Sequence, residues 1–187
     1  PYVGSLTLAG FPSVLYYQHM ISVATSYIQG IHRNQYDDRT VHLIDMDDTL
    51  TLKPEGFDNV GLTKEEFFEK SYYFEPNPSV TYLLDLMRQW GDAIAICTAR
   101  PVSLIQETMD WPVGNGIDFD SILHSTGIVP SSIAKQFMIK DLRRTYDRIG
   151  TMIDDSPYNV KGARLQHVGA ILIDTNSQYW EANPEVV

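Results

Sequence analysis

Short apolar runs alternate with amphipathic stretches along most of the chain after residue 40. Five of these runs are rich in β-branched residues, and turn-forming or polar residues flank them, which is typical of buried strands. They lie at residues 41–44, 93–97, 122–123, 151–153 and 170–173. Strands that alternate with helices predict an α/β fold with a mostly parallel five-stranded sheet and helices on both faces.

Helix-start signals mark the stretches between these strands. Asn77 followed by Pro78 predicts a cap and a first turn, with the helix running to about Trp90. We expect a second helix after Pro101, a third over residues 132–146, and a fourth opened by the Ser-Pro pair at residues 156–157.

The N-terminal part shows a different pattern. Apolar side chains recur at nearly helical spacing, at Val14, Tyr17, Ile21, Ala24, Ile28 and Ile31. This spacing predicts an amphipathic helix over residues 12–31 that ends near Gly30. We therefore expect residues 1–39 to form an N-terminal helical segment packed on the core, and residues 40–187 to form the main domain.

Composition and charge narrow the classes of protein. The chain has 187 residues, of which 43% are hydrophobic and 20% charged, the profile of a folded globular protein without a membrane span. A net charge of −10 argues against a broad groove for nucleic acid, although it leaves room for a local basic pocket. The single cysteine, Cys97, excludes an internal disulfide and favours the cytoplasm or another reducing compartment.

Candidate chemistry lies where the strands end, because ligands of such folds bind at the carboxyl ends of the strands. Asp45 and Asp47 follow the first strand. Two carboxylates two residues apart can face one pocket, one as nucleophile and the other as acid and base. Acid-rich strand exits are also common as turns or helix caps.

Two further strand ends carry polar groups. Thr98 and Arg100 follow the second strand, and their hydroxyl and guanidinium groups suit phosphate oxygens. Alternatively, Thr98 caps the next helix and the Arg100 side chain is solvated. Asp154 and Asp155 follow the fourth strand, as ligands for Mg²⁺ together with Asp45, or as a helix-capping pair.

A lysine near the start of the helix before this fourth strand completes the set. Lys135 lies 19 residues before Asp154 and could neutralise the nucleophile and the phosphate. Lys140 competes for this role, and surface lysines on helices usually have no role beyond solvation.

In this order, the motifs resemble those of the haloacid dehalogenase (HAD) superfamily of phosphatases. The matching segments are LIDMDDTL at residues 43–50, CTAR at residues 97–100, Lys135, and IDD at residues 153–155. The resemblance covers about residues 40–175. Asp48 stands where many members have glycine.

The resemblance implies a Rossmann-like sheet, Mg²⁺ and an aspartyl-phosphate intermediate. Asp45 would be the nucleophile and Asp47 the acid/base, while Thr98 and Lys135 would hold the phosphate. Arg100 and Thr49 would contact the substrate. The metal ligands would come from a set of four acids, namely Asp45, Asp47, Asp154 and Asp155.

The spacing of the motifs leaves room for only a short flap. The intervals from Asp45 to Thr98 and from Thr98 to Lys135 are filled mostly by predicted helices and one strand, so we expect no large cap domain. The flap covers about residues 51–76, and Thr63 and Glu66 form a capping box in it. Its aromatic side chains fit either core packing, the commoner role, or stacking on a nucleobase; they are Phe67, Phe68, Tyr72, Tyr73 and Phe74.

The layout is most similar to the phosphatase domains of polynucleotide kinase-phosphatases, with Lys53 and Ser131 as departures. We therefore expect a phosphorylated substrate, first a nucleotide or nucleic-acid phosphate end. Phosphoproteins and small phosphorylated metabolites are the alternatives. The rival classes are a phosphotransferase and a catalytically silent phosphate-binding or interaction module.

Overall fold

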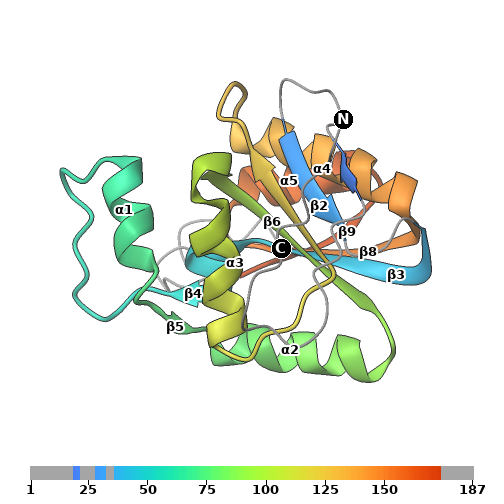
Figure 1. Ribbon diagram of the computed structural model, residues 1–187, viewed down its shortest axis with the longest axis horizontal. Coiled ribbons are helices and arrows are strands. Elements are labelled where there is room, and N and C mark those ends of the chain that lie inside the picture. The colour runs from blue at the N-terminus through green and yellow to red at the C-terminus, as the bar shows by residue number, and fades with distance from the viewer. Residues whose placement is uncertain (1–18, 22–27, 33–35, 174–187) are drawn as a thin grey trace, which may run out of the picture.

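The computed structural model describes residues 19–21, 28–32 and 36–173. Its main sheet has seven strands in the order β1-β2-β7-β6-β3-β8-β9 (Figure 1). Neighbours from β7 to β9 are parallel, whereas β1 and β2 are antiparallel additions beside β7. The strands of this sheet are β1 (His19–Ile21), β2 (Ile28–His32), β3 (Asp37–Ile44), β6 (Ala93–Pro101), β7 (Ser121–Ser125), β8 (Tyr146–Asp154) and β9 (Gly169–Leu172).

Helices cover both faces of the sheet. The helices α2 and α3 lie on one face and α4 and α5 on the other (Figure 1). Their bounds are α2 (Pro78–Gln89), α3 (Ile105–Gly114), α4 (Ser131–Thr145) and α5 (Pro157–Leu165), with a 3₁₀ turn η2 (Val102–Leu104) before α3.

Two hydrophobic cores follow from the alternation of side chains along the strands. In β6, Ala95 and Cys97 pack in one core together with α4 and α5, and Ile94 and Ile96 pack in the other together with α2. All four of these side chains are fully buried. Strands buried on both faces give the continuous apolar runs that the sequence shows.

The five predicted parallel strands and the four predicted helices after residue 40 are confirmed. Asn77 caps α2, because its side chain accepts a hydrogen bond from the backbone N–H of Ser79 at 3.1 Å. The helix predicted for residues 12–31 is wrong where the structure describes it, because β1 and β2 are strands there. The rest of that range lies outside the described residues.

A sheet edge explains this error. β7 would otherwise expose unpaired backbone groups on one side, and β2 fills that edge in antiparallel register from Ile28 opposite Ser125 to His32 opposite Ser121. Pairing between distant segments overrides the local helical spacing of apolar residues. The division into residues 1–39 and 40–187 stays a prediction.

The flap contains β4 (Thr51–Leu52), α1 (Lys64–Ser71) and β5 (Glu75–Pro76). Figure 1 shows it beside the carboxyl ends of the strands. The predicted capping box is present, with Thr63 and Glu66 bonded reciprocally. Core packing is confirmed for some of the aromatic side chains, and stacking on a nucleobase stays a prediction. The rings of Phe57, Phe67 and Phe74 pack edge to face. Tyr72 and Tyr73, in contrast, are exposed.

A buried polar network joins β2 to the rest of the domain. The His32 ring bonds to the Ser121 hydroxyl at 3.0 Å and to the Asp141 carboxylate at 3.1 Å, and Ser121 also contacts the Tyr146 hydroxyl at 2.7 Å. Each of these side chains is at most 2% exposed. These bonds fix the position of β2 against β7 and α4.

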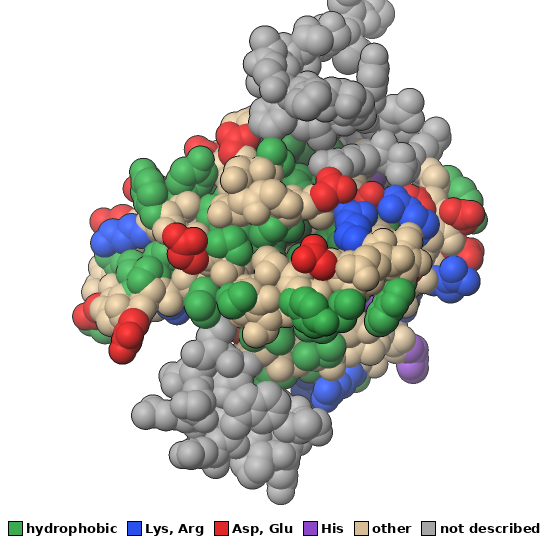
Figure 2. Space-filling view, turned by 90° about the horizontal axis from the view of Figure 1, so that it is seen from below, with side chains coloured by type: hydrophobic (Ala, Val, Ile, Leu, Met, Phe, Trp, Pro, Cys, Tyr) green, Lys and Arg blue, Asp and Glu red, His purple; other side chains and the backbone are tan. Residues whose placement is uncertain are grey.

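The net charge of the chain is −10. Figure 2 shows the face on the α2 side, where acidic and hydrophobic side chains are interspersed. Within the described residues, no helix combines the length and apolar character needed to cross a bilayer.

Replacing Gly150 of β8 with Ala is expected to lower the free energy of unfolding by about 1–3 kcal/mol, as overpacking does. A Cβ at this position would lie 2.6 Å from Cε1 of His42. This ring cannot move freely, because it bonds to the Asp92 carboxylate and to the Thr151 N–H, each at 3.0 Å. Urea unfolding checks the result. Gly169→Ala is the control, since its Cβ would meet nothing closer than 3.7 Å, and an equal loss there would contradict the steric explanation.

Candidate active site

Asp45 and Asp154 meet at the carboxyl edge of the sheet, because β3 and β8 are adjacent and parallel. The backbone N–H of Asp45 donates to the carbonyl of Ile153 at 2.9 Å, which fixes the exit of β3 against β8. Lys135, from α4, donates one hydrogen bond to each of the two carboxylates. The side chains of Lys135 and Asp154 are essentially fully buried, and that of Asp45 is nearly so.

The electrostatics of this group follow from burial and from its two carboxylates. Burial alone would lower the pKa of Lys135, but the charges of Asp154 and Asp45 outweigh burial and raise it, so the ammonium stays charged. Burial raises the pKa of Asp45, and the charges of Asp154 and Asp155 add to this rise, while Lys135 opposes it. The lysine is therefore the cation that allows two acids to share this buried site.

Asp155 completes a group of three acids that fits a divalent cation. One ligand oxygen each of Asp45, Asp154 and Asp155 lies within 4.8 Å of the others. Burial, followed by the charge of Asp154, raises the pKa of Asp155 to about 6. Hard carboxylate oxygens that repel one another in this way are the donor set that suits Mg²⁺. Asp47, also predicted as a ligand, is not in this group.

Neighbouring side chains hold these acids in place. Asn159, in the first turn of α5, donates to Oδ1 of Asp154 at 2.9 Å, and the backbone N–H of Ser156 donates to the same oxygen at 2.9 Å. The Thr49 hydroxyl, predicted to contact substrate, is buried and donates to Asp155 at 3.4 Å. The structure therefore places Thr49 against a candidate metal ligand.

The carboxylate of Asp47 pairs with Arg100. The guanidinium donates from Nε at 2.9 Å and from Nη2 at 2.6 Å to the two carboxylate oxygens. Nη2 also donates to the Ser71 hydroxyl at 2.6 Å, and the guanidinium lies 5.7 Å from the ring centre of Phe68. Arg100 is only 1% exposed. Through its bonds to Asp47 and Ser71, it links the predicted acid/base to the flap.

Thr98 is buried at the end of β6, next to β7. Its hydroxyl accepts a hydrogen bond from the backbone N–H of Arg100 at 3.1 Å, which shapes the loop that carries the guanidinium. His124, opposite Thr98 in the sheet register, bonds through Nδ1 to the carbonyl of Arg100 at 3.3 Å. Burial lowers the pKa of His124 to about 4, so the ring is neutral at pH 7.

Asp48 has a backbone conformation that favours glycine. Its φ is +63°, in the left-handed region that costs side-chain-bearing residues energy and that Asp tolerates better than most. Glycine adopts this conformation without strain, which fits the glycine that the resemblance to the HAD superfamily implies here. Lys53 forms an ion pair with Asp48 at 2.7 Å, which ties the start of the flap to the site.

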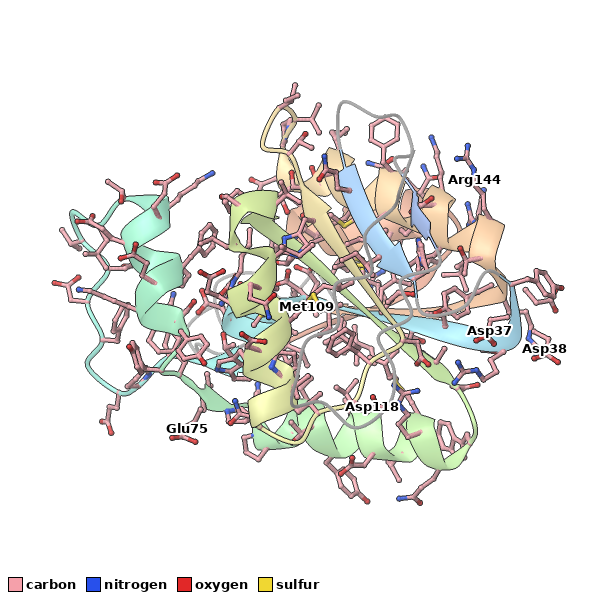
Figure 3. All side chains as sticks on the ribbon, in the orientation of Figure 1. Asp37, Asp38, Glu75, Met109, Asp118 and Arg144 are labelled. Carbon is pink, nitrogen blue, oxygen red and sulfur yellow. The ribbon has the colours of Figure 1, made fainter. Side chains whose placement is uncertain are left out.

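A second charged cluster lies at the amino edge of the sheet. Figure 3 shows Asp37 at the start of β3 and Asp118 near α2, both away from the flap. Arg39 bonds to Asp37 at 2.6 Å and to Asp120 at 2.8 Å, and Arg88 bonds to Asp120 at 2.5 Å. These bonds join the start of β3 to α2 and to the residue before β7.

Ser71 and Asn159 were not predicted from the sequence. Asn159 stands in the first turn of the helix after Asp154, so a search for amides just after an acidic strand end could have found it. Ser71 lies 29 residues from Arg100 and follows no motif, so no sequence signal indicates their contact.

Replacing Arg100 with Lys is expected to lower kcat about 10- to 100-fold, if Asp47 is the acid/base. A lysine keeps the charge but cannot bond to both carboxylate oxygens and to Ser71 at once, and charge-assisted hydrogen bonds are worth about 1.5–3 kcal/mol. Steady-state kinetics with a phosphomonoester check this. Arg144→Lys, at an exposed position of α4, is the control. An Arg100→Lys variant with wild-type kcat would show that orientation of Asp47 is unimportant.

The fold matches solved structures, although sequence comparisons find no relative. No protein-family model matches the chain, and no curated protein matches it in sequence. A HAD-like phosphatase from Mesorhizobium loti has a TM-score of 0.57 at 10% identity, and the match covers 82% of each chain. A haloacid dehalogenase-like hydrolase from Streptococcus pneumoniae has a TM-score of 0.52 at 17% identity, over 79% of this chain and 91% of that one.

A chain of the Pnkp1/Rnl/Hen1 RNA repair complex gives a TM-score of 0.59 at 18% identity. The match covers 74% of this chain but only 45% of the repair-complex chain, so the present chain spans less than half of that protein. Together these similarities show a HAD-like fold and confirm the resemblance inferred from the motifs at the level of the fold.

Proposed function

We propose that this protein is a phosphomonoesterase that forms an aspartyl phosphate on Asp45. The observation that carries the proposal is the meeting of Asp45, Lys135, Asp154 and Asp155 at the carboxyl edge of a HAD-like sheet. A purely structural ion pair needs only one carboxylate beside the lysine. Here Lys135 binds two carboxylates, and a third acid, Asp155, lies beside them.

In the first step, a carboxylate oxygen of Asp45 attacks phosphorus while the bond from phosphorus to the leaving oxygen breaks. Asp47 gives its proton to that oxygen, and a neutral alcohol leaves. Lys135 and Thr98 stabilise the charge of the phosphate. The phosphate also competes with Asp47 for the Arg100 guanidinium, since both are acceptors for the same donors.

In the second step, water attacks phosphorus and Asp47 accepts its proton. The bond from phosphorus to the Asp45 oxygen breaks, which releases inorganic phosphate and restores the carboxylate. Arg100 orients the Asp47 carboxylate before substrate binds. When the phosphate takes over the guanidinium, the Asp47 carboxyl group is free to carry the proton in both steps.

Asp45, Asp154 and Asp155 would hold Mg²⁺, with Asp47, the fourth predicted ligand, turned toward Arg100. When bound, the cation would supply positive charge to the phosphate oxygens. Asn159 and Thr49 keep the carboxylates oriented for it.

The proposed substrate is a nucleotide or a nucleic-acid phosphate end. The short flap leaves the site open to a large leaving group, and the fold is similar to a chain of an RNA repair complex. Phosphoproteins and small phosphorylated metabolites are the alternatives that substrate tests would separate.

Release of phosphate from a substrate panel tests the proposal. The panel contains nucleoside 3′- and 5′-phosphates, a 3′-phosphorylated oligonucleotide, a phosphopeptide, sugar phosphates and an aryl phosphate. We expect release that EDTA abolishes and excess Mg²⁺ restores. A folded protein that releases no phosphate from any compound would refute the proposal and favour a phosphate-binding module.

A further inference from the structure

A pocket of about 510 Å³ lies beside the flap, between α1 and the segment that leads into α3. Aromatic rings form much of its wall, from Phe68, Tyr72 and Tyr73, and Leu104 lines it as well. Tyr72 is 42% exposed and Tyr73 is 81% exposed. The centres of their rings lie 5.5 Å apart. Two neighbouring tyrosines left in solvent beside a pocket are typical of a binding surface.

Arg100 connects this pocket with the candidate active site. Arg100 lines the pocket, its guanidinium lies 5.7 Å from the ring centre of Phe68, and the same guanidinium pairs with Asp47. Arg100 is therefore shared by the pocket and the predicted acid/base, Asp47. Because Asp45 does not line the pocket, one molecule with a phosphate at Asp45 and a ring in the pocket needs a spacer between them, such as a pentose.

The charges at the pocket favour a ring with polar edges and disfavour a polyanion. Glu69 and Glu107 line it, with Lys70 and Arg100 as the cations. The two carboxylates can accept hydrogen bonds from exocyclic amino groups and ring N–H groups, and the two cations can donate. A strand of nucleic acid would bring phosphates toward Glu69 and Glu107, which repel them.

We propose that this pocket binds the nucleobase of a nucleoside monophosphate whose phosphate lies at Asp45, an inference that rests on the proposed phosphatase function. The base stacks on the exposed ring of Tyr73, since the rings of Tyr72 and Tyr73 are nearly perpendicular, and the pentose passes Arg100. The volume, of the size that small-molecule sites usually have, accommodates a nucleoside.

The test compares wild type, Tyr73→Ala and the Tyr72→Ala/Tyr73→Ala double variant. Tyr82→Ala is the matched control, because Tyr82 is 62% exposed but lies on α2 and not in the pocket. Substrates are adenosine and cytidine 5′- and 3′-monophosphates, ribose 5-phosphate, 4-nitrophenyl phosphate and a 3′-phosphorylated oligonucleotide. The single variant Tyr73→Ala removes an almost fully exposed side chain, so folding is not at risk.

For the nucleoside monophosphates, kcat/KM is expected to fall about 10-fold in Tyr73→Ala, as the loss of one stacking partner does. For ribose 5-phosphate it should stay within about twofold, and Tyr82→Ala should match wild type for every substrate. The inference is overturned if wild type hydrolyses ribose 5-phosphate, the aryl phosphate or the oligonucleotide better than the nucleotides. It is also overturned if the tyrosine variants affect all substrates equally.

Binding of adenosine, which carries no phosphate, separates this inference from the proposed function. Saturation-transfer NMR should show contact between adenosine and the wild-type and Tyr82→Ala proteins, but much less with Tyr73→Ala. If no phosphate is released from any substrate while this pattern holds, the phosphatase proposal fails and the base pocket stands. Phosphate release from the panel without adenosine contact refutes the pocket alone.

Discussion

Asp45→Asn is expected to lower phosphate release by at least about 10⁴-fold, in line with the loss of a nucleophile in other covalent enzymes. An amide cannot attack phosphorus, and other groups hold the neighbouring carboxylates of Asp47 and Asp154. Asp47 is held by Arg100, and Asp154 is bound by Lys135, Asn159 and a backbone N–H. The measurement is steady-state phosphate release in Mg²⁺, with the substrate that the panel identifies.

The fold of this variant should be unchanged, since Lys135 keeps its bond to Asp154 and the backbone bond of residue 45 to Ile153 is preserved. Circular dichroism and the thermal midpoint verify this. Asp38→Asn, at an exposed position of β3 far from the flap, is the control and should retain full activity (Figure 3). Turnover of Asp45→Asn within tenfold of wild type would exclude the covalent mechanism.

Lys135→Met is expected to lower the free energy of unfolding by about 3–5 kcal/mol in metal-free buffer, besides abolishing activity. The substitution leaves Asp45 and Asp154 buried side by side without the ammonium that neutralises them. Methionine fills most of the volume of the lysine side chain, so the loss is electrostatic. Urea unfolding with and without Mg²⁺ measures it, and Mg²⁺ should restore part of the lost stability.

Lys140→Met is the matched control for this prediction. Lys140 lies on the same helix but is exposed, with its ammonium 5.3 Å from the ring centre of Phe137. We expect a change below about 0.5 kcal/mol, as for surface substitutions in general. If the two variants lost equal stability, the carboxylate pair around Lys135 would not be the source of the effect.

The sequence predicts the central fold well, because local signals and tertiary packing agree there. Residues 93–97 form a continuous apolar run, and the structure buries both of its faces. Asn77-Pro78 and the Thr63/Glu66 pair are local capping signals, and both operate as predicted. The added strands β1 and β2 were missed, because their pairing depends on the exposed edge of β7, about 90 residues away.

For the candidate site, motif order predicts which strand ends meet but not how the side chains pair. Asp45, Asp154 and Lys135 come together as expected, because adjacent parallel strands end at one edge. The pairing of Arg100 with Asp47 depends on the path of the loop after β6, and its contact with Ser71 depends on the fold of the flap. Both are properties of tertiary structure that residue spacing does not encode.

The network around His32 has a consequence for synthesis on the ribosome. His32 bonds to Ser121 and Asp141, which are 89 and 109 residues further along the chain. At about 5–20 residues per second, β2 would wait roughly 4 to 22 seconds for its partners to be synthesised. During that time its edge would stay unpaired and able to join another chain. β2 is therefore synthesised before β7 and α4 but can join the sheet only after they have been synthesised. A chaperone that shields β2 in the meantime would raise the yield of folded protein.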